Sequence, residues 1–198
     1  MARLPLVIYP DVILKTRCAD ITEIDGDLVS FAEDMADTMY LSHGIGLAAP
    51  QVAKNIRMMT VDVEQENGRS ALMTLVNPII AGTHGRTTYE EGCLSFPGIT
   101  AEVKRNDQIH VVAYDLQGQE LDFEADGLLS ICIQHELDHL NGVTFVDRLN
   151  PVKRKLVVRN YLGLRAQEQQ DEREADLKAR ILGASAVPDH SDTDCSCC

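Results

Sequence analysis

The stretch QHELDH at residues 134–139 is the part of the sequence from which the fold and its chemistry are most directly predicted. On a helix, His135 and His139 lie on one face, one turn apart, so their imidazoles can converge on a single cation. Glu136 follows the first of them, where its carboxylate can reach a water bound to that cation. Chance produces this pattern on the order of once per hundred chains of this histidine content. We therefore predict that the segment is a metal-binding helix.

This helix is expected to run from about Gly127 to Leu140, after a set of β-strands. Asp126 stands at its N-cap position, and Asn141-Gly142 supplies a left-handed stop. Runs of apolar and β-branched residues indicate strands at 56–63, 71–76, 108–115 and 120–125, with a hairpin turn at 116–119. Helices and strands do not alternate regularly, which argues against a parallel doubly wound sheet.

Two further helices are expected on either side of this region. The first spans residues 27–42 and is capped by Asp25 or Asp27. The other begins near Pro151 and extends to about Leu182, with Gly163 as a break. Its second half is polar all round, which is typical of a helix that projects into solvent.

Length and composition indicate one domain, or one domain with a tail. The chain has 198 residues, of which 44% are hydrophobic and 25% charged, as in ordinary globular proteins. It contains no run of about 18 apolar residues and therefore no candidate membrane span. The first residues lack the pattern of a signal peptide. A cytoplasmic location is the resulting expectation, and disulfides are not expected there.

A catalytic metal needs about three protein ligands, so a third donor is required besides the two histidines. Cys93 is a candidate, because it lies in EGCLS at 91–95 and Gly92 lets the backbone pass close to a metal. The alternative is that Cys93 is a small buried hydrophobic residue. Cys132, three residues before His135, either packs in the core or lines a pocket.

A glycine-bearing segment, GIGLAAPQ at 44–51, follows the first predicted helix. Gly44 and Gly46 allow the backbone to approach a ligand closely, and Gln51 offers an amide donor to a developing oxyanion. Alone this motif is weak, because glycine-rich turns more often serve chain reversal than catalysis.

The charge of the chain is strongly acidic but unevenly distributed. A formal net charge of −13 argues against a general nucleic-acid binder. Residues 151–165 nevertheless carry five basic side chains and no acid. This basic segment either steers one anionic partner to the protein or is a solvated helix face.

The three motifs together resemble those of peptide deformylases. GIGLAAPQ, EGCLS and QHELDH occur here in the order and spacing of that family, and the chain looks like a bacterial-type member from about residue 3 to about residue 165. The resemblance implies an α+β fold in which antiparallel β-sheets pack around a central metal-binding helix, with an N-terminal and a C-terminal helix. The catalytic domain is accordingly placed at 1–165. The residues beyond do not resemble the family, and their composition predicts a solvent-exposed helical extension at 166–183 and a disordered, cysteine-containing tail at 184–198.

The resemblance also implies roles for the matching residues. The metal ligands are Cys93, His135 and His139, and the general acid/base is Glu136. The oxyanion donors are Gln51 and the backbone N–H of Leu94. The pocket for a methionine side chain includes Ile45, Gly46, Ile131, Cys132 and His135. In addition, Arg105 either pairs with Glu91 to hold the metal-binding loop or is an exposed arginine.

The implied reaction is removal of the formyl group from the N-terminal methionine of nascent chains, with release of formate. The family implies Fe²⁺ as the physiological ion, whereas the donor set also accepts Zn²⁺, Ni²⁺ or Co²⁺. Because the substrate emerges from a ribosome, the basic segment 151–165 is interpreted as a ribosome-docking surface.

Two other functions compete with this interpretation. Zinc metallopeptidases share the HExxH pattern, but they usually take a third ligand from downstream, and no HExxHxxGxxH extension is present. A non-catalytic metal-binding protein is the second rival, since Cys195, Cys197 and Cys198 could bind a soft metal. The simpler interpretation of these cysteines is a tail with incidental thiols.

Overall fold

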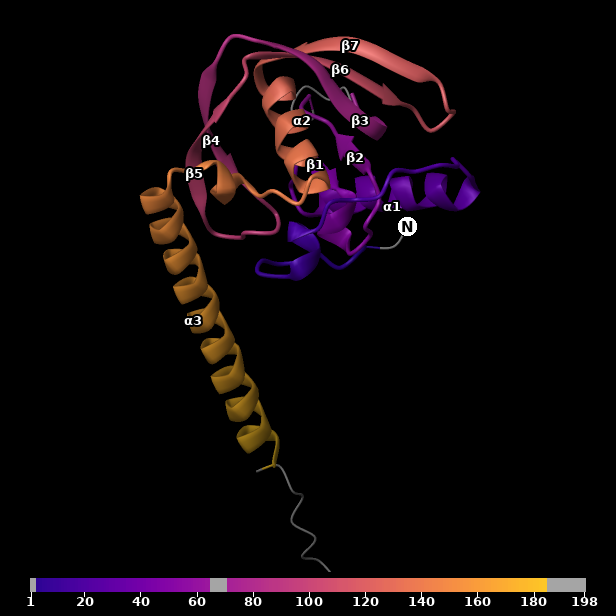
Figure 1. The fold of residues 1–198 in the computed structure, drawn as a ribbon. Coiled ribbons are helices and arrows are strands. Elements are labelled where there is room, and N and C mark those ends of the chain that lie inside the picture. The colour runs from indigo at the N-terminus through magenta and orange to yellow at the C-terminus, as the bar shows by residue number, and fades with distance from the viewer. Residues whose placement is uncertain (1–2, 65–70, 185–198) are drawn as a thin grey trace, which may run out of the picture. The chain divides into compact units, whose positions relative to one another are not determined.

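The structure is a computed structural model that describes residues 3–64 and 71–184 (Figure 1). The chain divides into two compact units, Met1–Val158 and Arg159–Cys198. The first unit contains the described strands and the first two α-helices. The second contains most of the last helix.

Two antiparallel sheets build the first unit. The larger has five strands in the order β1-β2-β3-β6-β7, and the smaller is the β4–β5 pair. The strands are β1 Gly46–Ala48, β2 Met58–Val61, β3 Met73–His84, β4 Thr87–Gly92, β5 Thr100–Arg105, β6 Gln108–Tyr114 and β7 Glu120–Asp126. Every pairing between these strands is antiparallel, which confirms the predicted α+β class.

Helix α2, Gly127–Leu140, lies at the centre of this unit, and its bounds match those predicted from the sequence. Figure 1 shows α2 with β6 and β7 above it and the β4–β5 pair to its left. Each residue from Ser130 to Leu140 is buried. Ile133, Leu137 and Leu140 pack in a core cluster with side chains of β2, β3 and β6. The predicted metal-binding segment is therefore buried against the five-stranded sheet.

Helix α1, Gly26–Leu41, is capped by Asp25, whose carboxylate accepts a hydrogen bond from the Leu28 N–H at 2.8 Å. Its buried face, which includes Met35 and Met39, packs in a second core cluster with residues of β1 and β2. At its end the Gly44 N–H donates to the Met39 carbonyl at 2.9 Å, as in a Schellman motif. His43 adopts the left-handed conformation, with φ of 56°, that glycine usually supplies there.

Helix α3, Pro151–Ala184, continues through Gly163, so the predicted break is wrong. A glycine inside a helix costs about 1 kcal/mol, which the neighbouring helix formers offset. The side chains of residues 166–180 are exposed. Ala184, the first residue of the predicted tail, is still helical, and residues 185–198 lie outside the described part of the chain.

Several strands depart from the sequence prediction. β1 lies inside the glycine-bearing segment 44–51, for which no strand was predicted, and the β4–β5 pair was not predicted either. β3 continues to His84 because Asn77 and Pro78, which normally interrupt strands, lie at a shift of register between Val76 and Ile79. Among the described residues, no helix is both long enough and apolar enough to cross a membrane.

Candidate metal centre

Three side chains from two separate elements converge beside helix α2. His135 and His139 come from adjacent turns of α2, and their ring centroids are 5.1 Å apart. Cys93 follows β4 directly, and its Sγ lies 3.2 Å from Nε2 of His139. One donor atom from each of the three residues lies within 4.8 Å of the others. The predicted ligands are thus brought together by the fold.

The two imidazoles differ in protonation. Burial alone would lower the pKa of His135, but its hydrogen bonds with Cys93 and Glu91 raise it well above the ordinary value, so a metal ion would have to displace a proton from this ring. Nδ1 of His135 lies 2.8 Å from a carboxylate oxygen of Glu91, and a proton held there leaves Nε2 of His135 free to be a ligand. Burial lowers the pKa of His139 well below its ordinary value, and His135 adds to this effect. His139 is therefore neutral at pH 7. Once the metal has displaced their protons, the Cys93 thiolate and the two neutral imidazoles form a donor set that fits a divalent transition-metal ion.

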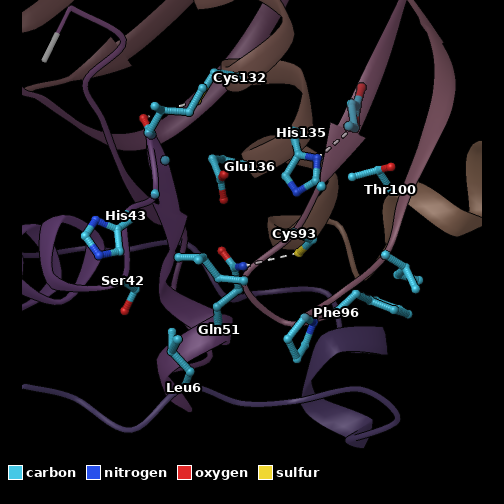
Figure 2. Close-up of a pocket in the computed structure, with 18 of the residues that line it drawn as sticks. Leu6, Ser42, His43, Gln51, Cys93, Phe96, Thr100, Cys132, His135 and Glu136 are labelled. Carbon is cyan, nitrogen blue, oxygen red and sulfur yellow. Dashed lines mark hydrogen bonds and ion pairs between the residues drawn. The ribbon is translucent and has the colours of Figure 1, made fainter. Parts of the chain in front are cut away.

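Glu136 projects into the same space as Cys93 and His135 (Figure 2). Its side chain is buried, and within the described residues its Oε2 has no hydrogen-bond partner. Burial raises the pKa of Glu136 to about 7, although the nearby His135 acts in the opposite direction. A buried carboxylate with a free oxygen and a pKa near neutrality is suited to accept and return a proton.

Gln51 is held so that its amide N–H₂ faces the cluster. It belongs to the short helix Ala49–Val52, and its Oε1 accepts a hydrogen bond from the Ala48 N–H at 2.8 Å. Its Nε2 lies 3.6 Å from Cys93 Sγ and 3.4 Å from Ser95 Oγ. Leu94, whose backbone N–H was the other predicted donor, lines the same cavity.

The cluster opens into a cavity of about 770 Å³. Ile45, Gly46, Ile131 and Cys132, the residues predicted to hold a methionine side chain, all line it. It is also lined by residues that the sequence did not single out, among them Leu6, His43, Tyr89, Phe96 and Thr100. They come from segments far apart in the chain, and Figure 2 shows Leu6, His43, Phe96 and Thr100 around Cys93 and His135. No motif in the sequence marks them.

A buried ion pair lies behind His135. Arg105 contacts Glu91 through two bonds, Nε to Oε1 at 2.6 Å and Nη2 to Oε2 at 2.9 Å. Both side chains are 3% exposed, so Arg105 is not the exposed arginine of the alternative interpretation. Burial alone would raise the pKa of Glu91, but the hydrogen bonds from Arg105 and His135 hold it below its ordinary value. Arg105 also reaches Asp138, which sequence reasoning missed.

An α+β fold with this cluster beside a buried glutamate defines the chain as a candidate metal-dependent hydrolase. Residues 3–155 match the family model described as polypeptide deformylase. A peptide deformylase from Syntrophobacter fumaroxidans is 42% identical over 161 residues, which are 81% of this chain and 95% of that protein. The chain belongs to the peptide deformylase family.

Solved structures agree with this assignment. A crystal structure of a peptide deformylase from Legionella pneumophila has a TM-score of 0.79 and 36% identity, covering 85% of this chain and 98% of that one. The peptide deformylase from Synechococcus elongatus, solved in complex with actinonin, has a TM-score of 0.76 and 40% identity, covering 79% and 86%. These structural similarities confirm the α+β fold that surrounds the cluster.

The close packing at Gly46 predicts the effect of adding one methyl group. A Cβ at this position would lie 2.6 Å from Oε1 of Glu136 and 2.7 Å from Sγ of Cys132. Because the Glu136 carboxylate has to move away, Gly46→Ala is expected to lower kcat for formate release about 10- to 100-fold. Gly26→Ala is the control, since a Cβ there meets no atom within 4 Å. A Gly46→Ala protein with kcat within about twofold of wild type would contradict this geometry.

Proposed function

We propose that this chain removes the N-formyl group from the N-terminal methionine of newly made proteins and releases formate. The observation that carries the proposal is the convergence of Cys93, His135 and His139 beside Glu136 and the Gln51 amide. It stands in a chain whose residues 3–155 match the deformylase family. The HExxH metallopeptidase alternative is not favoured, because the third donor is an upstream cysteine rather than a downstream histidine or glutamate.

In this proposal Cys93, His135 and His139 hold a divalent cation, which acts as a Lewis acid and makes water a stronger acid when it is bound. Glu136 takes a proton from the attacking water, whose oxygen forms a bond to the formyl carbon. Gln51 Nε2 and the backbone N–H of Leu94 donate to the formyl oxygen as it becomes negative. Glu136 then gives its proton to the leaving amine as the C–N bond breaks, which leaves formate and a free N-terminus.

The cavity beside the cluster is proposed to hold the methionine side chain. Ile131 and Cys132 come from α2, and Ile45 and Gly46 come from the segment after α1. An unbranched thioether adapts well to a cavity with such mixed walls. Gly46 supports this arrangement, because a larger residue there would meet both Glu136 and Cys132.

Glu136→Gln tests the proton-transfer role. The change keeps the size of the side chain but removes the base, so turnover is expected to fall at least about 100-fold. The bound metal, measured by elemental analysis, is expected to stay at the wild-type level because Glu136 is not a ligand. Formate release from a formyl-methionyl peptide is the readout, with cleavage of the peptide bond assayed in parallel. Near-normal formate release by Glu136→Gln would refute the mechanism, and peptide-bond cleavage by the wild type would favour the metallopeptidase.

We further propose Fe²⁺ as the physiological ion. A thiolate with two imidazoles accepts Fe²⁺, Co²⁺, Ni²⁺ or Zn²⁺, and intrinsic affinity favours the later metals over iron. Iron-dependent activity is then expected to be lost in air, through oxidation of the metal or of Cys93.

Anaerobic purification with elemental analysis tests the identity of the metal. Iron is expected in the protein, and formate release is expected to fall after exposure to oxygen and to return on reconstitution with Fe²⁺. Nickel reconstitution is the control, because Ni²⁺ is less readily oxidised in this donor set. A zinc protein with full activity, and no gain on reconstitution with iron, would exclude the iron assignment.

The basic segment 151–165 is proposed to dock on the ribosome, whose RNA is anionic. Part of its charge is already engaged, since Arg154 pairs with Asp147 at 2.7 Å and Lys153 lies 3.9 Å from Glu102. We place the catalytic domain at 1–165, followed by a solvent-exposed extension at 166–183 and the cysteine-containing tail at 184–198. The exposed side chains of 166–180 support this division. The protein is proposed to work in the cytoplasm, where its nascent substrates are made.

Charge reversal within helix α3 tests ribosome docking. Changing Lys153, Arg154 and Lys155 together to glutamate is expected to abolish cosedimentation with ribosomes at low salt, because the helix would then repel RNA. Reversal of Arg173, Lys178 and Arg180, three exposed cations further along α3, is the matched control and is expected to retain cosedimentation. Equal binding by the first variant and the wild type would overturn the docking proposal.

A further inference from the structure

A row of alternating charges extends from His135 toward the protein surface. Glu91 contacts Nδ1 of His135, and Arg105 holds both oxygens of Glu91. Nη1 of Arg105 donates to Oδ2 of Asp138 at 2.6 Å. Arg148 completes the row, with its Nε 2.9 Å from the same Oδ2 and its Nη2 bonded to Oδ1. Asp138 is therefore clamped between two guanidinium groups.

The row is electrically balanced only when Arg148 is included. Within it, Glu91 and Asp138 carry two negative charges, whereas Arg105 and Arg148 carry two positive ones. The side chains of Glu91, Arg105 and Asp138 are 3%, 3% and 5% exposed, but that of Arg148 is 49% exposed. Without Arg148, one guanidinium would have to neutralise two buried carboxylates, which is a costly arrangement.

This charge balance affects the candidate ligand His135 because Arg105 contacts both Glu91 and Asp138. Arg105 uses Nε and Nη2 for Glu91 and Nη1 for Asp138. If Asp138 loses its contact with Arg148, its negative charge attracts Arg105 more strongly. The two hydrogen bonds from Arg105 to Glu91 are then weakened. Glu91 in turn orients the His135 ring, and partners of this kind set the basicity and direction of a ligating imidazole.

We propose that Arg148 is a positioning residue for the metal site, which acts through Asp138, Arg105 and Glu91 to hold His135 in its ligating orientation. This inference rests on the proposed function only in taking Cys93, His135 and His139 as the metal ligands. Because Arg148 is half exposed, its pairing with Asp138 is open to screening by salt. Metal retention therefore depends on ionic strength through this one arginine.

The rate of metal release tests the proposal. Full-length protein loaded with Co²⁺ is mixed with excess chelator, and loss of the cobalt–thiolate absorption is followed at low and at high KCl. Arg148→Gln is expected to release Co²⁺ about 3- to 10-fold faster than wild type, less than the 10- to 100-fold typical of removing a direct partner of a ligand. Glu91→Gln, which alters the direct partner of His135, is the reference and is expected to show this larger increase in the rate of Co²⁺ release.

Three comparisons separate positioning from a general effect on the fold. High KCl is expected to accelerate release in the wild type but not in Arg148→Gln, whose screened contact is already absent. Arg148→Lys restores the charge but not the two-pronged contact, so an intermediate rate is expected. Arg180→Gln, which removes an exposed arginine paired with Asp176 at 3.1 Å, is expected to keep the wild-type rate and salt dependence.

The outcomes also separate this inference from the proposed function. If Arg148→Gln lowers the thermal midpoint but keeps the wild-type release rate and salt dependence, Arg148 only stabilises the fold and the inference is wrong. If the wild type binds Co²⁺ through these ligands but releases no formate, the proposed function fails while the positioning role stands. A release rate for Glu91→Gln equal to that of wild type would overturn the path through Glu91.

Discussion

The burial of a polar helix is the constraint on which this structure depends. Each residue of α2 from Ser130 to Leu140 is buried, although this stretch carries two histidines, two acids and a glutamine. Buried polar groups need partners, because an unpaired one costs about 1 to 3 kcal/mol. Gln134 bonds to Ser130 and Asn106, and Asp138 is held by Arg105. Among the described residues, the buried side-chain atoms without a partner are Oε2 of Glu136, Nδ1 of His139 and Oγ of Ser42. Of these, the Glu136 oxygen lies where the proton transfer is proposed to occur.

The two sheets have different tasks around this helix. The five-stranded sheet supplies the apolar surface on which Ile133, Leu137 and Leu140 pack. The β4–β5 pair supplies the polar groups, since Glu91 lies on β4, Arg105 ends β5 and Cys93 directly follows β4. Separating the pair from the main sheet allows its polar side chains to face α2 without interrupting the apolar core. The geometry of the centre therefore depends on how β4 and β5 pair.

The local features of this fold could be predicted from the sequence, because they depend on neighbouring residues. The bounds of α2 follow from its helical periodicity and from Asn141-Gly142 directly after its end. The turn after β6 follows from the glycine within it. The β4–β5 pair could not be predicted, since TTYEEG and TAEVKR are mostly polar and owe their pairing to each other. The candidate ligands were predicted from motifs, and Glu91–Arg105 from an expected ion pair. The roles of Asp138 and Arg148 were not predicted, because their connection to His135 runs through contacts with Arg105 and Glu91. These side chains come from separate elements, and no single sequence motif contains them all.

Cys93 and the two histidines belong to elements that are held to each other by packing and by the ion pairs behind His135. A cation bound by all three would tie β4 to α2 by a further, reversible link. Binding of this kind stabilises the folded state by mass action, by about 2.7 kcal/mol when the free metal is a hundredfold above its dissociation constant. The supply of metal in the cell would then set the lifetime of the folded chain as well as its activity, because metal-starved copies would open more often and be exposed to proteases.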